Sequence, residues 1–252
     1  MTAPGVSPSK PAFRAPGPVA LVGSGEFLPV MATVDAGLLD GRTARAVIIP
    51  TASAPEGTQV FNRWMTMGVK HFTSLGVESV PLAVTDRRSA DDPGLAAQLA
   101  GSGLVYLSGG NPAFLTATLR GTRVWTAIVE AWRGGAALAG CSAGAMALSA
   151  RAPDPRVGVE GEGLGLVAHL AVIPHFDRMS SWRPELAGHL VASVPAGQFV
   201  VGIDEDTALV GGPDQWTVAG RQGVWLLSPA GSQRFGPGER IELPAVGPGA
   251  TV

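Results

Sequence analysis

The sequence predicts an α/β fold: a mostly parallel sheet flanked by helices on both faces, with a short antiparallel C-terminal extension. Three observations support this. Short apolar runs alternate with longer amphipathic segments along most of the chain. Polar, glycine-rich segments follow the apolar runs, at the carboxyl ends where open parallel sheets bind ligands. The length of 252 residues and the 46% hydrophobic composition suffice for one substantial core.

The expected strands are short, apolar and bounded by glycine or polar residues. They are Pro18–Val22, Ala46–Ile49, Ser79–Leu82, Leu104–Leu107, Ala136–Ala139, Leu170–Ile173 and Phe199–Ile203, followed by the antiparallel runs Thr207–Val210, Gln215–Val218 and Val224–Leu227. The expected helices are Thr58–Leu75, Pro93–Leu99, Pro112–Leu119, Val124–Arg133 and Pro184–Val194. We expect a disordered lead-in at residues 1–17, a single α/β domain at 18–228 and an irregular tail at 229–252, because both ends are rich in proline or glycine.

Composition and charge narrow the function classes. The net charge of −2 argues against a nucleic-acid partner. Cys141 is the single cysteine, which excludes intrachain disulfides and metal sites built on paired cysteines. The chain begins without the apolar run of a signal peptide, and no apolar run approaches the ~20 residues of a membrane helix. We therefore expect a cytoplasmic protein with no membrane partner, no metal and no cofactor.

The segment from Gly140 to Gly144 matches the G-x-S-x-G pattern of a nucleophile elbow. It lies directly after an apolar strand and before residues that can open a helix, which is the context that this motif requires. A sharp turn there exposes the hydroxyl of Ser142, and the N–H of Ala143 lies at a helix N-terminus that favours negative charge. The alternative is a glycine-rich turn with a capping serine. Cys141, one residue before the apex, is predicted to be a small buried packing residue.

A serine nucleophile needs a base, and His175 is the best placed of the four histidines. His71 and His189 fall within predicted helices, where we expect surface positions. His169 and His175 flank one strand and are separated by roughly 20 Å at ~3.3 Å per residue, so both cannot serve one site. Only His175 follows the carboxyl end of that strand. A structural histidine with satisfied hydrogen bonds is the alternative.

A base in turn needs an orienting carboxylate, and several candidates remain. Glu205 follows the strand Phe199–Ile203 on the same edge of the sheet, so we favour it. Neighbouring strand positions point to opposite faces, which keeps Asp204, Asp206 and Asp177 in competition. Asp154 lies between the serine and the histidine in the sequence.

The second oxyanion donor is expected from the turn Ser108–Asn111, which follows the strand Leu104–Leu107. Its consecutive glycines, Gly109 and Gly110, allow backbone N–H groups to approach a ligand closely. A simple turn without a ligand is the alternative, because Gly and Asn are common in turns.

These residues together resemble the cyanophycinase and peptidase E group of serine peptidases, which have a class I glutamine-amidotransferase-like fold. The resemblance covers about Pro18 to Val210. It depends on four segments: Ser108–Asn111, Gly140–Ala145, Gly163–Leu166 leading to Pro174–Phe176, and Gly202–Leu209. It implies Ser142 as nucleophile, His175 as base and Glu205 as acid, with oxyanion donors at Gly110 and Ala143. The peptidase E branch takes its acid from between serine and histidine, which keeps Asp154 open.

The resemblance is closer at these positions than in the substrate pocket. Ile173-Pro174 stands where cyanophycinases usually carry Asp-Gln, and Pro112 stands where they carry Gln. Of the arginines that follow their His-Phe pair, Arg178 and Arg183 remain at shifted positions, so cyanophycin itself is not the expected substrate.

The function predicted is a serine hydrolase that cleaves a small peptide or isopeptide through an acyl-enzyme. Asn111, Arg178 and Arg183 are the candidate substrate-binding residues, the arginines because they can pair with a carboxylate. The alternatives are a non-catalytic ligand-binding member of the fold, a peptidase E-like dipeptidase that uses Asp154, and a glutaminase-like transferase, which normally has cysteine at the apex. The sequence leaves the oligomeric state open, with a homodimer among the options.

Overall fold

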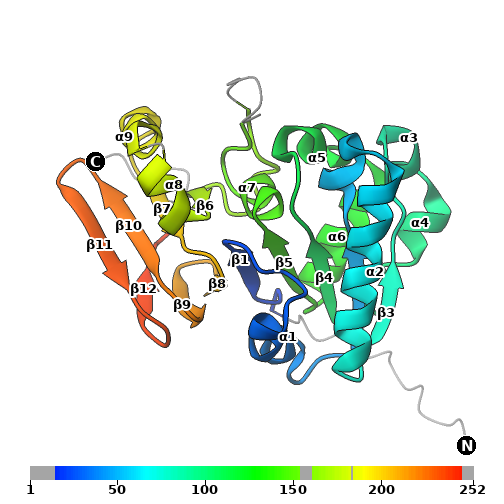
Figure 1. Ribbon diagram of the computed structural model, residues 1–252. Coiled ribbons are helices and arrows are strands. Elements are labelled where there is room, and N and C mark those ends of the chain that lie inside the picture. Colours follow the sequence, from blue (N-terminus) through cyan, green and yellow to red (C-terminus); the bar gives the residue numbers. More distant parts are fainter. Residues whose placement is uncertain (1–14, 154–160, 183, 246–252) are drawn as a thin grey trace, which may run out of the picture.

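Two β-sheets, rather than one, organise the chain. The computed structural model describes residues 15–153, 161–182 and 184–245. The large sheet has the strand order β12-β9-β8-β1-β5-β4-β2-β3, and the small sheet has the order β11-β10-β7-β6. Figure 1 shows the small sheet, with α8 and α9 above it, beside the large one.

Parallel strands form one part of the large sheet, as predicted. They are β1 (Val19–Val22), β2 (Arg45–Ile49), β3 (Glu78–Pro81), β4 (Leu104–Leu107) and β5 (Ala137–Cys141). Antiparallel strands then extend this sheet beyond β1, namely β8 (Thr207–Gly211), β9 (Gln215–Gly220) and β12 (Arg240–Glu242). The mostly parallel architecture with helices on both faces agrees with the prediction.

Helices cover the two faces of the large sheet unequally. On one face, α1 (Ala32–Leu39) and α2 (Thr58–Ser74) pack on Ala20, Ile48 and Tyr106. The other face is covered by α3 (Arg87–Ala90), α4 (Pro93–Ala97), α5 (Pro112–Leu119), α6 (Arg123–Arg133) and α7 (Ala143–Leu148). Two short 3₁₀ helices, η1 (Pro29–Met31) and η2 (Thr51–Glu56), follow β1 and β2.

The small sheet corrects the sequence-based topology. It contains β6 (Leu170–Pro174), β7 (Phe199–Ile203), β10 (Val224–Ser228) and β11 (Gly231–Phe235), and it packs against α8 (Phe176–Trp182) and α9 (Pro184–Ser193). β6 pairs with β7 in parallel, and neither pairs with a strand of the large sheet. Local apolar runs identify strands but not their partners, so the sequence placed both strands in one sheet.

The C-terminal tail and three helices also differ from the sequence-based expectations. The tail after Ser228 is not wholly irregular, because β11 pairs with β10 and β12 with β9. β11 is mostly exposed and polar, so it lacks the alternating pattern that reveals a half-buried strand. β12 buries its central Ile241 but has only three residues. Helices α1, α3 and α8 were not predicted. In α1 the apolar residues do not form one stripe, and α3 is a single turn held by the capping residue Asp86.

His71 is a buried residue, not a surface one. It is 7% exposed, and its Nε2 lies 2.8 Å from Oδ2 of Asp35 on α1. Burial raises the pKa of Asp35 although the bond from His71 opposes that shift. A polar residue in an amphipathic helix is normally assigned to the solvent face, and the buried partner on another helix could not be foreseen from α2 alone. His189 is exposed, as predicted.

Candidate active site

Ser142 lies at a strained turn between β5 and α7. Its backbone has φ 49° and ψ −107°, a left-handed conformation that is rare for a residue with a Cβ. The flanking glycines are required by space. A Cβ at Gly140 would lie 2.5 Å from the backbone of Gly144, and one at Gly144 would lie 2.3 Å from the carbonyl oxygen of Leu107. Ser142 thus lies at the apex of a sharp strand-to-helix turn, which the glycines on either side make possible.

His175 brings the small sheet into contact with this serine. It follows β6, also with a positive φ of 51°. Its Nε2 lies 3.0 Å from Oγ of Ser142, and its Nδ1 lies 3.1 Å from Oε1 of Glu205, which follows β7. The side chains of His175 and Glu205 are 37% and 30% exposed, so water reaches both. The hydroxyl, imidazole and carboxylate thus form one continuous hydrogen-bonded series, with the serine from one sheet and the other two from the second.

Three of the four competing carboxylates have other partners. Asp204 is 3% exposed and accepts hydrogen bonds from Nε1 of Trp225, and burial raises its pKa. Oδ1 of Asp177 accepts the backbone N–H of Glu205 at 2.9 Å. Asp206 lies 3.5 Å from Arg221. Asp154 lies outside the described residues, so its position relative to His175 is not part of this geometry.

Gln222, which the sequence analysis did not identify, also holds the loop of Glu205. Nε2 of Gln222 donates to the carbonyl oxygen of Glu205 at 2.9 Å and to Oδ2 of Asp177 at 3.3 Å. Asp177 and Gln222 therefore hydrogen-bond both backbone groups of Glu205, the N–H and the carbonyl oxygen. Gln222 lies in a turn between two strands, where no spacing or motif marks it.

Of the predicted oxyanion donors, Ala143 directly follows the serine, and Gly110 belongs to a turn that packs against it at Gly109. Ala143 is the first residue of α7, so its N–H has no partner within the helix. The turn after β4 lies against Ser142, since a Cβ at Gly109 would be 3.5 Å from Cβ of the serine. Gly110 has φ 139°, and a Cβ there would lie 2.3 Å from the carbonyl oxygen of Ala52, so only glycine fits.

Two of the three predicted substrate-binding residues, Asn111 and Arg178, have contacts within the protein. Oδ1 of Asn111 accepts the N–H of Phe114 and so caps α5. Arg178 is exposed, and its Nε lies 3.4 Å from Oε2 of Glu205, which places its guanidinium beside the series. Arg183 lies outside the described residues.

Cys141, directly before Ser142, forms a buried pair with Glu26. Cys141 is fully buried, as predicted, and its Sγ donates to Oε2 of Glu26 at 2.9 Å. Burial, followed by the charge of Glu26, raises the pKa of this thiol well above its usual range. A thiol held protonated in this way is a poor nucleophile. Glu26 itself belongs to the polar segment after β1, but no motif in the sequence marked it.

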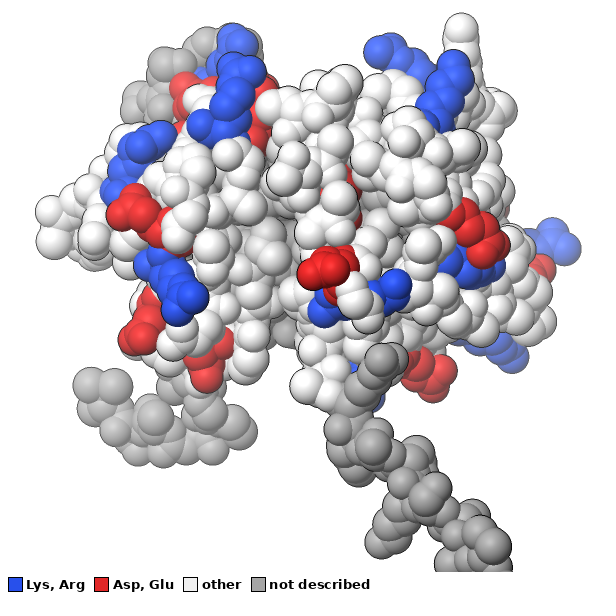
Figure 2. All heavy atoms as spheres, turned by 90° about the horizontal axis from the view of Figure 1, so that it is seen from below, with Lys and Arg blue, Asp and Glu red and all other residues white. Residues whose placement is uncertain are grey.

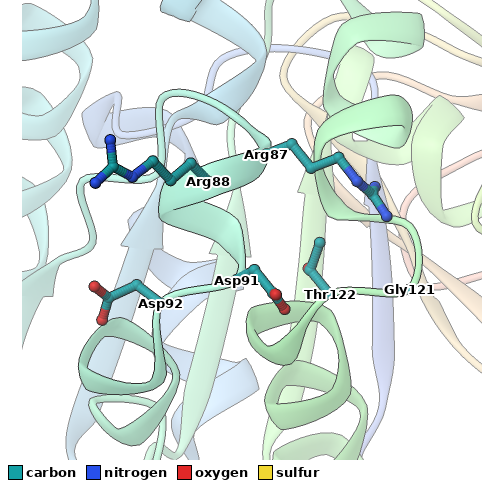
Figure 3. Close-up of a pocket in the computed structure, with 6 residues that line it drawn as sticks. All are labelled: Arg87, Arg88, Asp91, Asp92, Gly121 and Thr122. Atoms are coloured by element: carbon teal, nitrogen blue, oxygen red, sulfur yellow. The ribbon is translucent and has the colours of Figure 1, made fainter.

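Among the described residues, neither a separate hollow nor the charges on one face of the molecule form a comparable arrangement. A hollow of about 470 Å³ lies away from the series, where Arg87 and Arg88 point in opposite directions (Figure 3). Arg87 already donates to the carbonyl oxygens of Ala117 and Arg120. On the face seen in Figure 2, charges of both signs are scattered among uncharged side chains. Across the described ranges, His, Cys, Asp and Glu form no cluster suited to a metal ion, and no helix is long and apolar enough to cross a bilayer.

The fold and the site define an α/β protein with a serine at a sharp strand-to-helix turn, and the hydroxyl of this serine faces a histidine–carboxylate pair. Comparison with known proteins gives the family. Residues 20–218 match peptidase family S51, and the chain belongs to that family of peptidases.

Curated relatives and solved structures agree with this assignment. Cyanophycinases of Trichormus variabilis and of Nostoc sp. are each 30% identical over 200 residues, which cover 74% of this chain and 64% of theirs. The chain thus matches less than two thirds of these relatives. A crystal structure of a peptidase from an acI-B1 actinobacterium aligns with a TM-score of 0.82 and 37% identity, over 90% of this chain and 97% of that one. A putative peptidase E protein from Listeria monocytogenes aligns with a TM-score of 0.58 at 17% identity, over 88% of this chain and 99% of that one, which shows a shared fold.

Proposed function

We propose that this chain is a serine peptidase that cleaves a peptide or isopeptide bond through an acyl-enzyme, with Ser142 as nucleophile, His175 as base and Glu205 as orienting acid. The observation that carries the proposal is the series Ser142 Oγ, His175 Nε2 and Nδ1, Glu205 Oε1, with distances of 3.0 and 3.1 Å. Membership of a peptidase family supports the class of reaction.

The tautomer of His175 follows from its neighbours. A carboxylate can only accept, so Nδ1 carries the proton that it donates to Glu205. Nε2 is then the acceptor and can take the proton of the Ser142 hydroxyl as Oγ attacks the scissile carbonyl. The negative charge of Glu205 stabilises the imidazolium that forms, without accepting its proton.

The tetrahedral intermediate places its negative oxygen towards the N–H groups of Gly110 and Ala143. The imidazolium returns its proton from Nε2 to the leaving amine, the carbon–nitrogen bond breaks, and the acyl group stays on Ser142. Water then attacks the ester, with His175 again accepting and returning a proton, and the carboxylic acid product leaves. Backbone donors that face the oxyanion contribute more in the transition state than in the ground state.

The substrate that fits best is a small peptide or isopeptide with a carboxylate, because the exposed Arg178 lies beside the series. Because the curated relatives are named cyanophycinases, isopeptide bonds are the first bonds to test. The residues at Pro112 and Pro174 nevertheless differ from those of cyanophycinases. A glutaminase-like transferase is disfavoured because Cys141 is buried behind the apex.

Labelling with a fluorophosphonate tests the proposal without a known substrate. We expect stoichiometric phosphonylation of the wild type, located at Ser142 by peptide mass spectrometry. The Ser142→Ala variant should not label, and Cys141→Ser is the matched neighbouring control that should. A panel of α- and β-linked dipeptides then identifies a substrate. A folded wild type that neither labels nor hydrolyses any member would favour a non-catalytic ligand-binding protein.

A further inference from the structure

Glu26 is a buried carboxylate outside the proposed triad. It ends the polar segment that follows β1, and it is 5% exposed. A buried carboxylate needs hydrogen-bond partners to offset the loss of hydration. The partners of Glu26 all belong to the neighbourhood of Ser142.

The two oxygens of Glu26 join the ends of three adjacent strands. Oε1 accepts the N–H of Gly109 at 2.9 Å, at the start of the turn after β4. Oε2 accepts the thiol of Cys141 at 2.9 Å, at the end of β5 and directly before Ser142. Strands β1, β5 and β4 are neighbours in the large sheet, so one side chain spans the end at which the nucleophile lies.

The next residue, Phe27, fixes the direction of this carboxylate. Phe27 has φ 64°, a strained value for a residue with a Cβ, and is 6% exposed. Its ring lies 5.0 Å from the ring of Tyr106 and 6.0 Å from that of Phe72, measured between centroids. The packed ring holds the strained turn, and the turn directs Glu26 inward to Gly109.

The turn that Glu26 holds carries one of the proposed oxyanion donors. Two consecutive glycines are free to rotate, so their N–H groups have no fixed direction unless other contacts impose one. The N–H of Gly109 is bonded to Glu26, and the N–H of Asn111 is bonded to the carbonyl oxygen of Ala52 at 2.8 Å. The N–H of Gly110 lies between these two anchors.

We infer that Glu26 is a positioning residue that anchors the turn Gly109–Asn111, so that the N–H of Gly110 stays directed at the oxyanion of the serine reaction. This inference rests on the proposed function for its catalytic consequence. The anchoring itself is a property of the fold. The role requires an accepting oxygen and not a charge, since a negative charge near a developing oxyanion opposes it.

The test compares Glu26→Ala, which removes the acceptor, with Glu26→Gln, which keeps an oxygen for Gly109 and removes the charge. Asp35→Asn is the matched control, because Asp35 is a buried carboxylate of the same core that bonds His71 instead. Two readouts are needed. Amide hydrogen exchange of residues 108–111 reports the anchor, and the rate of Ser142 phosphonylation with kcat and KM on the identified peptide reports its consequence.

We expect exchange at Gly109 to accelerate in Glu26→Ala. Phosphonylation and kcat should fall about 10- to 100-fold with KM little changed, less than the 10²–10³ for complete loss of a donor. Glu26→Gln and Asp35→Asn should keep wild-type exchange in the turn and rates within about threefold. Should Glu26→Ala fail to fold, Glu26→Asp replaces it, since its shorter side chain cannot span Gly109 and Cys141 together, and the same direction of change is expected.

The outcomes separate this inference from the proposed function. Unchanged exchange at Gly109 in Glu26→Ala overturns the anchor while Ser142 still labels. Faster exchange with unchanged kcat and phosphonylation overturns the link to the oxyanion. Equal loss in Glu26→Gln and Glu26→Ala shows that charge is the operative property, which also contradicts the inference. If wild-type Ser142 does not label, the proposed function fails, and hydrogen exchange alone decides whether Glu26 anchors the turn.

Discussion

The serine and the histidine–glutamate pair are held in place by different interactions. Ser142 and its turn are held by close steric packing at the end of the large sheet, where glycines at 110, 140 and 144 have no room for a Cβ. His175 and Glu205 stand on the small sheet, are 37% and 30% exposed, and are held by hydrogen bonds from polar side chains. Steric fit therefore dominates around Ser142, where the hydrogen bond from Gly109 to Glu26 adds to it, whereas hydrogen bonds dominate around His175 and Glu205. Substitutions in the two regions should therefore fail in different ways.

The largest effect should come from removing the imidazole at the junction of the two regions. We expect His175→Ala to lower kcat on the order of 10⁶, because a triad acts as a unit. The matched control is His189→Ala, an exposed histidine on α9, which should leave kcat unchanged. Steady-state kinetics on the identified peptide check this. Normal kcat in His175→Ala would remove the base from the proposal.

The next largest effect should come from replacing the orienting acid Glu205, and it should exceed the effect of replacing the neighbouring Asp177. Glu205→Gln should lower kcat on the order of 10⁴ with the fold intact, because the amide no longer selects the productive tautomer. Asp177→Asn keeps an acceptor for the N–H of Glu205, so we expect a loss of about tenfold or less. Asp154→Asn should also be mild. If Asp154→Asn is the crippling change and Glu205→Gln the mild one, the acid belongs to the peptidase E arrangement.

A shape-based change probes the support of the serine. Gly110→Ala puts a Cβ 2.3 Å from the carbonyl oxygen of Ala52 at φ 139°, so the turn must move. We expect kcat to fall about 10²–10³-fold, as for loss of one oxyanion donor, together with a lower Tm. Gly37→Ala on α1 is the control, because a Cβ there meets nothing within 4 Å. Thermal unfolding and steady-state kinetics of both variants check this prediction. A Gly110→Ala protein with wild-type kcat would contradict the steric requirement at this turn.

The smallest effect should come from Cys141→Ser, which retains a donor for Glu26. Turnover should stay within about threefold of wild type, because the thiol takes no part in the reaction. Burial and the nearby carboxylate raise the pKa of this thiol, so it is protonated at neutral pH and should resist iodoacetamide in the folded protein. Mass spectrometry of treated protein checks this. Rapid alkylation with loss of activity would mean that the cysteine is part of the working site.

The sequence predicted the features that depend on residues close together in the chain. Apolar runs placed β4, β5 and β7 within one or two residues, and the glycine pattern around Ser142 anticipated a steric requirement that the coordinates show in detail. The sequence did not predict the division into two sheets, because the local sequence of β6 and β7 does not identify the strands with which they pair. Glu26, Gln222 and the His71–Asp35 pair were missed for a related reason: each acts through a partner distant in sequence, and no periodicity records such a partner.

The most direct test of the whole account is a crystal structure of the protein after reaction with a fluorophosphonate. We predict phosphorus bonded to Oγ of Ser142 and the phosphoryl oxygen about 2.7–3.1 Å from the N–H groups of both Gly110 and Ala143. We also predict that Nδ1 of His175 remains bonded to Glu205. An adduct on Cys141, a phosphoryl oxygen turned away from the Gly109–Asn111 turn, or a different carboxylate on His175 would contradict these predictions.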